Sequence, residues 1–325
     1  MGTAPRGDEL LALLRRPDLE RAEVDPTLAV QARLVLENAV EPHLPFEAPL
    51  RVTKEVVRRV LRCETHLLAQ LGSDSGYFAT AAMVKGAMAD RLFTQVVAGF
   101  RIGDDVVAAA LESADAVGDA RLRRDWGRLA LQEQDEVRTG LESIAVGLLE
   151  RWPDLPSGAL PRVQEALRVE LCGGAVVLAG RLDLLLGRPR SGRVGTIMLD
   201  AKAGSIRTDD RDDVLWYCLL ETLRSGLPPF QIGNYYLSSG ALDLQPVTTE
   251  DLDRATGRVA DALARLSRLA AGGEAQRSPG PLCPWCPVYA SCEEGQAHVH
   301  GADESTAAWL SFDEEWNEED VFDAD

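Results

Sequence analysis

The chain has 325 residues, of which 46% are hydrophobic and 26% charged. This balance is typical of a globular protein and excludes a fibrous or largely disordered one, and the length suffices for roughly two domains. Since no run approaches the roughly 18 apolar residues of a membrane span and the first residues lack a secretion signal, we expect a cytoplasmic protein with no membrane partner.

The net charge of −18 alone would argue against a nucleic-acid partner. The charge is unevenly distributed, however, because residues 293–325 contain 12 Asp and Glu and no Lys or Arg. In the remainder, 34 Lys and Arg stand against 40 Asp and Glu, a net charge of −6. A mildly acidic body can still carry a local basic groove, so the charge does not exclude DNA.

The first half of the chain is predicted to be mostly helical. Prolines divide residues 1–50 into helical hairpins, and one amphipathic helix should begin after the N-cap Thr53 and end near Gly72. Further apolar periodicity predicts helices over residues 77–100, 104–117 and 120–152.

After Pro161 the pattern changes to strands. Two strand-forming runs flank residues 172–174, a third strand covers 194–204, and a strand pair surrounds Ser239–Gly240. Helices are predicted over 208–223 and 249–271. This order implies an α/β or α+β fold with a mixed sheet flanked by helices.

A hairpin in this region carries three charged residues that could perform chemistry. Asp183 and Asp200 lie at equal distances from a turn between Ser191 and Gly192, so symmetric pairing would place their carboxylates opposite each other. Lys202 shares a strand face with Asp200. Paired carboxylates favour Mg²⁺ or Mn²⁺, which can activate a water that the lysine orients, as phosphodiester hydrolysis requires. The alternative is a solvated hairpin with an Asp–Lys ion pair.

Cysteines form the second candidate site. Cys283, Cys286 and Cys292 have the spacing C-x2-C-x5-C, which is typical of a metal or cluster site. The fourth ligand could be Cys63, or it could be His298 or His300, which would complete a zinc site. The other two cysteines, Cys172 and Cys218, are expected to be ordinary buried residues.

The residues G-R-L-D at 180–183, a turn, D-A-K-A-G at 200–204 and a helix with Tyr217 resemble the PD-(D/E)XK nuclease superfamily, and within it the RecB-like exonucleases. The resemblance covers roughly residues 53–293. It implies a restriction-endonuclease-like core and a metal-dependent deoxyribonuclease, an exonuclease rather than an endonuclease. The implied substrate is single-stranded DNA or DNA ends, and the implied setting is DNA repair, recombination or defence.

The resemblance also implies roles for individual residues. Asp183, Asp200 and the main-chain carbonyl of Ala201 would hold Mg²⁺ or Mn²⁺, Lys202 would position the attacking water, and Tyr217 would support Lys202 or a phosphate. Where the family has a metal-binding histidine, four residues after a glycine, this chain has Gly86 and Asp90, and His66 is a rival for that role. Where the family has a glutamine, this chain has Asp213.

A single cysteine in an N-terminal helix followed by C-x2-C-x5-C near the C-terminus resembles the iron–sulfur nucleases of the AddB type and the CRISPR-associated RecB-like exonucleases. This resemblance implies a structural 4Fe–4S cluster bound by Cys63, Cys283, Cys286 and Cys292, with Zn²⁺ as the alternative.

We therefore expect a helical N-terminal extension (1–52), a helical region with the first cluster cysteine (53–160), the nuclease core with the C-terminal cysteine group (161–293) and an acidic, disordered tail (294–325). Such an acidic run is most often a solvated, solubilising extension. The aromatic residues among its carboxylates are the argument for the alternative, docking on a helicase, on another protein partner or on the DNA groove of the chain. The rival functions are a non-catalytic nucleic-acid-binding or adaptor protein and a zinc-binding interaction module.

Overall fold

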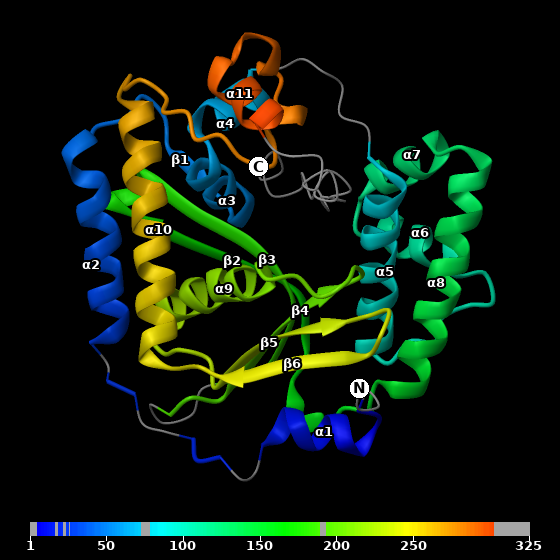
Figure 1. Cartoon of the computed structure of the whole chain (residues 1–325). Helices are drawn as coiled ribbons and strands as arrows, with labels where there is room; N and C mark the ends of the chain where they lie inside the picture. The colour runs from blue at the N-terminus through cyan, green and yellow to red at the C-terminus, as the bar shows by residue number, and fades with distance from the viewer. Residues whose placement is uncertain are drawn as a thin grey trace. The chain divides into compact units, whose positions relative to one another are not determined.

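The structure is a computed structural model that describes residues 5–16, 19–21, 24–25, 27–72, 79–188 and 193–301. The chain divides into two compact units (Figure 1), each assembled from separate stretches of sequence. Unit 1 comprises residues 1–31, 78–167 and 180–255, and unit 2 comprises residues 32–77, 168–179 and 256–325.

The helices of unit 1 largely follow the predicted periodicity. They are α1 (Asp8–Arg15), α5 (Ala81–Val97), α6 (Val106–Ala116), α7 (Ala120–Arg128), α8 (Leu131–Arg151) and α9 (Asp210–Ser225). The single helix predicted over 120–152 is wrong, because Leu129 and Ala130 have extended backbone conformations. The Glu133 side chain accepts a hydrogen bond of 2.8 Å from the Ala130 N–H, which starts the second helix.

The sheet of unit 1 contains β3 (Val176–Gly187), β4 (Thr196–Lys202), β5 (Gln231–Tyr236) and β6 (Ala241–Pro246). β3 and β4 are antiparallel, with Leu184 opposite Leu199, which is the register expected from symmetric pairing about the turn. β4 and β5 are parallel, and β5 and β6 are antiparallel. The sheet is therefore mixed, as predicted, and β2 (Arg162–Leu171) also pairs with β3.

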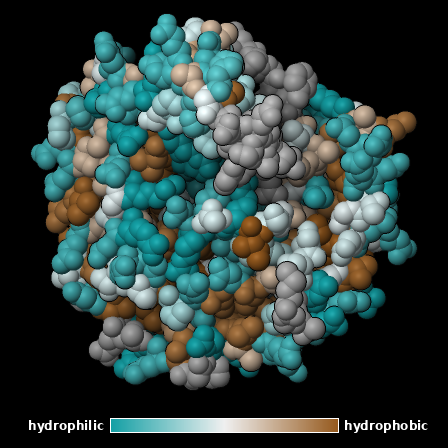
Figure 2. Space-filling model, viewed as in Figure 1, coloured by the Kyte–Doolittle hydropathy of each residue, from teal (hydrophilic) through white to brown (hydrophobic). Residues whose placement is uncertain are grey.

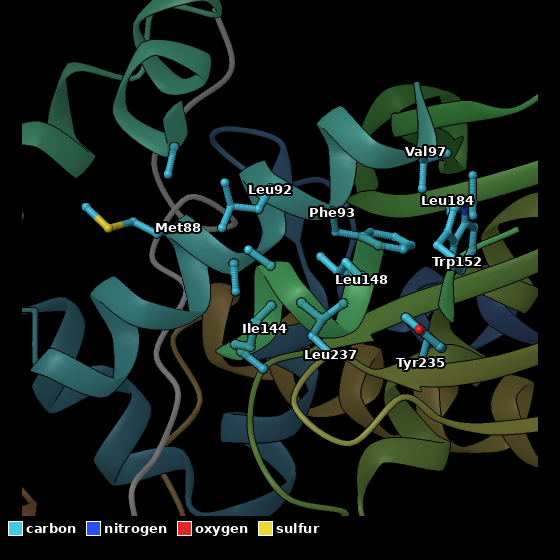
Figure 3. Close-up of a cluster of buried hydrophobic side chains, with 14 of the residues drawn as sticks. Met88, Leu92, Phe93, Val97, Ile144, Leu148, Trp152, Leu184, Tyr235 and Leu237 are labelled. Atoms are coloured by element: carbon cyan, nitrogen blue, oxygen red, sulfur yellow. The ribbon is translucent and has the colours of Figure 1, made fainter. Parts of the chain in front are cut away.

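Helices α5 and α8 contribute side chains to the same hydrophobic core of unit 1 as the sheet does (Figure 3). Phe93 of α5 meets Trp152 edge-on at 5.0 Å between ring centroids and stacks on Tyr235 of β5 at 5.8 Å. Aromatic contacts of this kind add to the free energy of apolar burial. They fix α5, the helix that carries Asp90, to the sheet.

Unit 2 has a smaller set of elements. They are most of α2 (Leu28–Val40), the 3₁₀ turn η1 (Glu41–His43), β1 (Leu50–Val52), α3 (Lys54–Arg62), α4 (Glu64–Leu71), η3 (Cys172–Gly174), the larger part of α10 (Thr249–Ala270), η4 (Cys283–Trp285), η5 (Tyr289–Ser291) and α11 (Glu293–Gly301). The β1 strand pairs in parallel with the first residues of β3, with Leu50 opposite Val176.

The helix predicted from Thr53 to Gly72 is interrupted at Cys63. Thr53 caps α3 as expected, accepting a hydrogen bond from the Val56 N–H at 3.3 Å. Cys63 has an extended backbone, with φ of −162°, and α4 begins directly after it. Apolar periodicity continues through both helices, so it could not reveal the break.

Part of the segment predicted to be disordered is helical, because residues 293–301 form α11. The Gln296 side chain holds this helix to the preceding turn by donating to the carbonyls of Tyr289 (3.1 Å) and Ala290 (2.8 Å). The rest of the predicted tail, with its aromatic and acidic residues, lies outside the described residues. The face drawn in Figure 2 is mostly hydrophilic, and no helix among the described residues is long and apolar enough to cross a membrane.

Candidate active site and cysteine pocket

Lys202 lies at the end of β4, among carboxylates of unit 1. Its Nζ is 2.8 Å from Asp200 Oδ2 and 2.8 Å from Asp213 Oδ2, with Asp210 Oδ1 at 3.9 Å. The lysine side chain is only 14% exposed, so water screens these charges weakly. Lys202 is therefore held by ion pairs to carboxylates of β4 and α9.

The first turn of α9 positions Asp213, the second carboxylate that contacts Lys202. Asp210 begins this helix and accepts hydrogen bonds from the Tyr236 hydroxyl (2.7 Å) and the Arg207 N–H (2.8 Å). Burial raises the pKa of the Tyr236 phenol and the hydrogen bond to Asp210 raises it further, so the hydroxyl stays protonated and donates. This contact ties the start of α9 to β5. Asp213, at the family's glutamine position, thereby reaches Lys202 directly.

Asp183 and Asp90 are brought together by a residue that the sequence interpretation missed. The Nε2 of Gln164 donates to both oxygens of Asp90, at 3.0 and 2.9 Å, and to Asp183 Oδ1 at 3.2 Å. Asp183 Oδ2 accepts a hydrogen bond of 2.6 Å from the Ala201 N–H. Asp183 is thus linked on one side to α5 through Gln164 and on the other to β4.

Gln164 has a left-handed backbone, with φ of +52°, inside β2. Non-glycine residues rarely adopt this conformation and do so most often at functional sites. Residue-type patterns do not report backbone dihedral angles. The one available signal in the sequence was a polar amide in a strand that runs toward the carboxylate hairpin.

Tyr217 is buried on α9 and packs against β3. A side chain at Gly180 would place its Cβ 3.0 Å from Tyr217 Cε1 and 2.9 Å from Trp216 Nε1. Only glycine leaves room for this approach, which explains the first residue of the G-R-L-D motif. The proposed support of Lys202 or phosphate by Tyr217 remains a prediction.

The donor chemistry of the site fits a hard divalent cation. Carboxylate and carbonyl oxygens, as in Asp90, Asp183, Asp200 and Ala201, are the ligands that Mg²⁺ and Mn²⁺ prefer. The Gln164 amide nitrogen lies between the carboxylates of Asp90 and Asp183 and donates hydrogen bonds to both, in a place where a cation would also be attracted. Over the described ranges, no group of three or more His, Cys, Asp or Glu is arranged to hold a metal ion. A cation here would therefore take donors of other kinds as well.

Unit 2 contains a pocket of about 320 Å³ whose lining includes all four cysteines of the predicted group, Cys63, Cys283, Cys286 and Cys292. Burial raises the pKa of the Cys286 thiol, a hydrogen bond from the Val288 backbone opposes this rise, and the other three cysteines add to it. The backbone N–H of Gly280 lies 3.3 Å from Cys283 Sγ, and that of Gly295 lies 3.4 Å from Cys292 Sγ. Such contacts stabilise thiolates in iron–sulfur sites.

Gly295 keeps the space between two of these sulfurs open. A Cβ at this position would lie 3.2 Å from Cys292 Sγ and 3.5 Å from Cys283 Sγ. The pocket is larger than a single ion needs, and glycine preserves its volume. The pocket therefore gathers the four cysteines of the predicted group, although these described cysteines are not among any group of three or more His, Cys, Asp or Glu arranged to hold a metal ion.

Cys63 is held at the pocket by its neighbour Glu64, which is 1% exposed. The Glu64 carboxylate pairs with Arg268 and accepts a hydrogen bond of 2.8 Å from the Gln276 N–H. The Thr65 N–H donates to the Gln276 carbonyl at 3.3 Å. The break between α3 and α4 and these contacts direct Cys63 to the pocket, which residues far along the chain also line. In Figure 1, α4 lies beside α11.

The remaining candidate ligands lie elsewhere. His298 and His300 are exposed and do not line the pocket, and the His300 ring is hydrogen-bonded to the Gln296 carbonyl at 2.8 Å. His66 lines the cysteine pocket, whereas Asp90 belongs to the carboxylate site.

The two cysteines outside the group differ in burial. Cys218 is fully buried, which raises the pKa of its thiol to about 12 and keeps it neutral. Cys172 is only half-buried, contrary to the expectation of an ordinary core residue, because it lies in a 3₁₀ turn between two strands.

Comparison with known proteins agrees with the fold and the hairpin. The family model of the PD-(D/E)XK nuclease superfamily matches residues 57–293. The chain belongs to this superfamily, as the sequence motifs predicted. No curated protein matches the chain significantly.

Two solved structures show remote similarity. A protein from Eubacterium rectale described as a "putative exonuclease" is 14% identical, with 72% of this chain and 86% of that chain covered and a TM-score of 0.47. SSO0001 is 12% identical, with 74% and 96% covered and a TM-score of 0.27.

Proposed function

We propose that the protein is a Mg²⁺- or Mn²⁺-dependent deoxyribonuclease that removes nucleotides from single-stranded DNA or DNA ends, in DNA repair, recombination or defence. Membership of the superfamily supports phosphodiester hydrolysis on DNA. The observation that carries the proposal is the placement of Lys202 between Asp200 and Asp213 at the end of the strand that pairs with the Asp183 strand.

Each residue has a defined part in this mechanism. Asp183, Asp200, Asp90 and the carbonyl of Ala201 would hold the cation, which supplies water activation and charge neutralisation at the phosphate. The Lys202 ammonium donates hydrogen bonds and fixes the attacking water, while Asp213 holds Lys202 in place.

Cleavage of end-labelled DNA tests this function. Wild type should shorten single-stranded DNA in the presence of Mg²⁺ or Mn²⁺, and both Lys202→Met and Asp200→Asn should lose at least about 100-fold in rate, as expected for removal of electrostatic groups in a nuclease site. Asp243→Asn, at an exposed carboxylate on β6, is the matched control. Circular single-stranded DNA distinguishes the modes, since an exonuclease leaves it intact. Equal cleavage by wild type and Lys202→Met would refute the assignment of the site, whereas no cleavage by wild type would leave a binding or adaptor role.

We also propose that Cys63, Cys283, Cys286 and Cys292 bind a structural 4Fe–4S cluster. The pocket volume, the glycine between two sulfurs and the N–H donors to sulfur support this proposal. Anaerobically purified protein should contain about four irons per chain, and Cys63→Ser should lose iron as fully as Cys286→Ser. One zinc per chain without iron would refute the cluster and support a zinc site instead.

The segment after Ala302 is proposed to dock on a basic surface, either of a partner such as a helicase or of the DNA groove of this chain. The support is its sequence of acidic and aromatic residues. If it covers the groove, truncation after Ala302 should tighten binding to single-stranded DNA at low salt and lose this effect at high salt. Identical binding at every salt concentration would leave docking on a partner, or a tail that only increases solubility.

A further inference from the structure

The amide of Gln164 occupies a special position between two carboxylates. Its nitrogen lies within 3.2 Å of three oxygens that belong to Asp90 and Asp183. Ionised carboxylates accept hydrogen bonds and cannot donate, so the nitrogen, and not the oxygen, of the amide must face them. The NH₂ group thereby offsets the repulsion between two negative charges.

The backbone of Gln164 is adapted to this position. Its φ of +52° lies in the left-handed region, although the residue belongs to a strand. Such a conformation persists where the surroundings determine it strongly. The three hydrogen bonds of the side chain to Asp90 and Asp183 hold Gln164 in this conformation.

An amide carries two different groups at its end. Rotation about the last side-chain bond exchanges NH₂ for a carbonyl oxygen at nearly the same place, and the barrier is low because this torsion is broad. Amide oxygens are ligands of hard divalent cations. The same side chain can therefore bridge the carboxylates without a cation and coordinate a cation once it is bound.

We propose that Gln164 is part of the cation site and changes roles by this rotation, with Nε2 facing Asp90 and Asp183 in the metal-free protein and Oε1 facing the bound cation. The inference rests on the proposed function, since it takes Asp90 and Asp183 as ligands. It adds a residue that the family motifs of the hairpin do not include.

The experiment measures Mn²⁺ binding to the full-length protein without DNA, by calorimetry and by the electron spin resonance of free Mn²⁺. Gln164→Leu removes both amide groups and should weaken Mn²⁺ binding by about tenfold or more, the size expected when a metal site loses a supporting group. Gln164→Glu keeps an oxygen and adds charge, so it should bind Mn²⁺ more tightly than wild type. In EDTA, Gln164→Glu should also have a lower thermal midpoint, which Mn²⁺ restores, because three carboxylates then meet without compensation.

Gln245→Leu is the matched control, because Gln245 on β6 donates a similar hydrogen bond of 3.1 Å to Asp243 at the surface of unit 1. It should bind Mn²⁺ as wild type does. Unchanged or tighter binding by Gln164→Leu would overturn the proposal. Should Gln164→Leu fail to fold, Gln164→Glu decides, and binding no tighter than wild type overturns it.

The outcome for Asp183→Asn separates this inference from the proposed function. If wild type binds Mn²⁺ and Asp183→Asn does not, the cation site stands, and the Gln164 variants test the amide alone. If wild type and Asp183→Asn bind alike, the assigned cation site itself is wrong.

Discussion

Removal of the Asp213 carboxylate should slow cleavage by releasing Lys202. The contact between Lys202 Nζ and Asp213 Oδ2 is 2.8 Å long, and the two side chains are 14% and 15% exposed. A hydrogen bond between charged groups in such a setting contributes about 1.5–3 kcal/mol. Because Asp200 remains as a second partner, we expect a loss of about 1.5–2 kcal/mol in Asp213→Ala, which corresponds to a roughly 10- to 30-fold lower kcat.

Steady-state cleavage of single-stranded DNA at saturating Mn²⁺ measures this effect. Since Asp213 holds the lysine rather than the DNA, kcat should fall while KM stays unchanged. Asp213→Asn, which keeps an acceptor, should recover part of the rate, and the surface variant Asp243→Asn should match wild type. A rise in KM with constant kcat would show that Asp213 contacts substrate and would refute the positioning role.

Three further changes test the packing described above. Gly295→Ala places a methyl group 3.2 Å and 3.5 Å from two cysteine sulfurs and should reduce iron content well below four per chain, whereas Gly257→Ala, with open space around it, should keep the iron. Gly180→Ala forces a methyl group to within 3.0 Å of the Tyr217 ring and should lower the free energy of unfolding by about 1–3 kcal/mol in chemical denaturation. Burial raises the pKa of Cys218 from 9.0 to about 12, so rising pH ionises the unfolded chain first and stability falls. Between pH 8 and pH 10 wild type should lose on the order of 1 kcal/mol more than Cys218→Ala, and equal losses would contradict the burial of a neutral thiol.

The sequence predicted the sheet better than the helix boundaries. The pairing of Leu184 with Leu199 follows from the position of the turn, because paired residues of an antiparallel hairpin lie at equal sequence distances from its turn. The helix break at Cys63 is accompanied by a long-range contact, the hydrogen bond from the Gln276 N–H to Glu64. The break at Leu129 is accompanied by a local contact, the hydrogen bond from the Ala130 N–H to Glu133 at the new N-terminus. Apolar periodicity is the same on both sides of each break and cannot report them.

The sequence predicted the acidic and basic residues of the candidate site, but it did not predict the residue that hydrogen-bonds to two of the carboxylates. Motif spacing identified Asp183, Asp200 and Lys202 because two-residue periodicity in strands and the symmetry of a hairpin relate them. Gln164 was missed because its role depends on a backbone angle and on a partner from α5, 74 residues away. Long-range contacts of this kind have no local sequence signal.

The assembly of unit 2 from three stretches of the chain has a consequence for biosynthesis. Unit 1 draws on residues up to 255, whereas unit 2 needs residues 256–325 for its last stretch. A ribosome adds about 5–20 residues per second, so the 220 residues that separate Cys63 from Cys283 take roughly 10 to 45 s to translate. During this interval Cys63 has been translated, but Cys283, Cys286 and Cys292 have not. The proposed cluster can therefore be assembled only after Cys292 has been translated, and messages truncated before Cys292 yield chains that cannot complete the pocket.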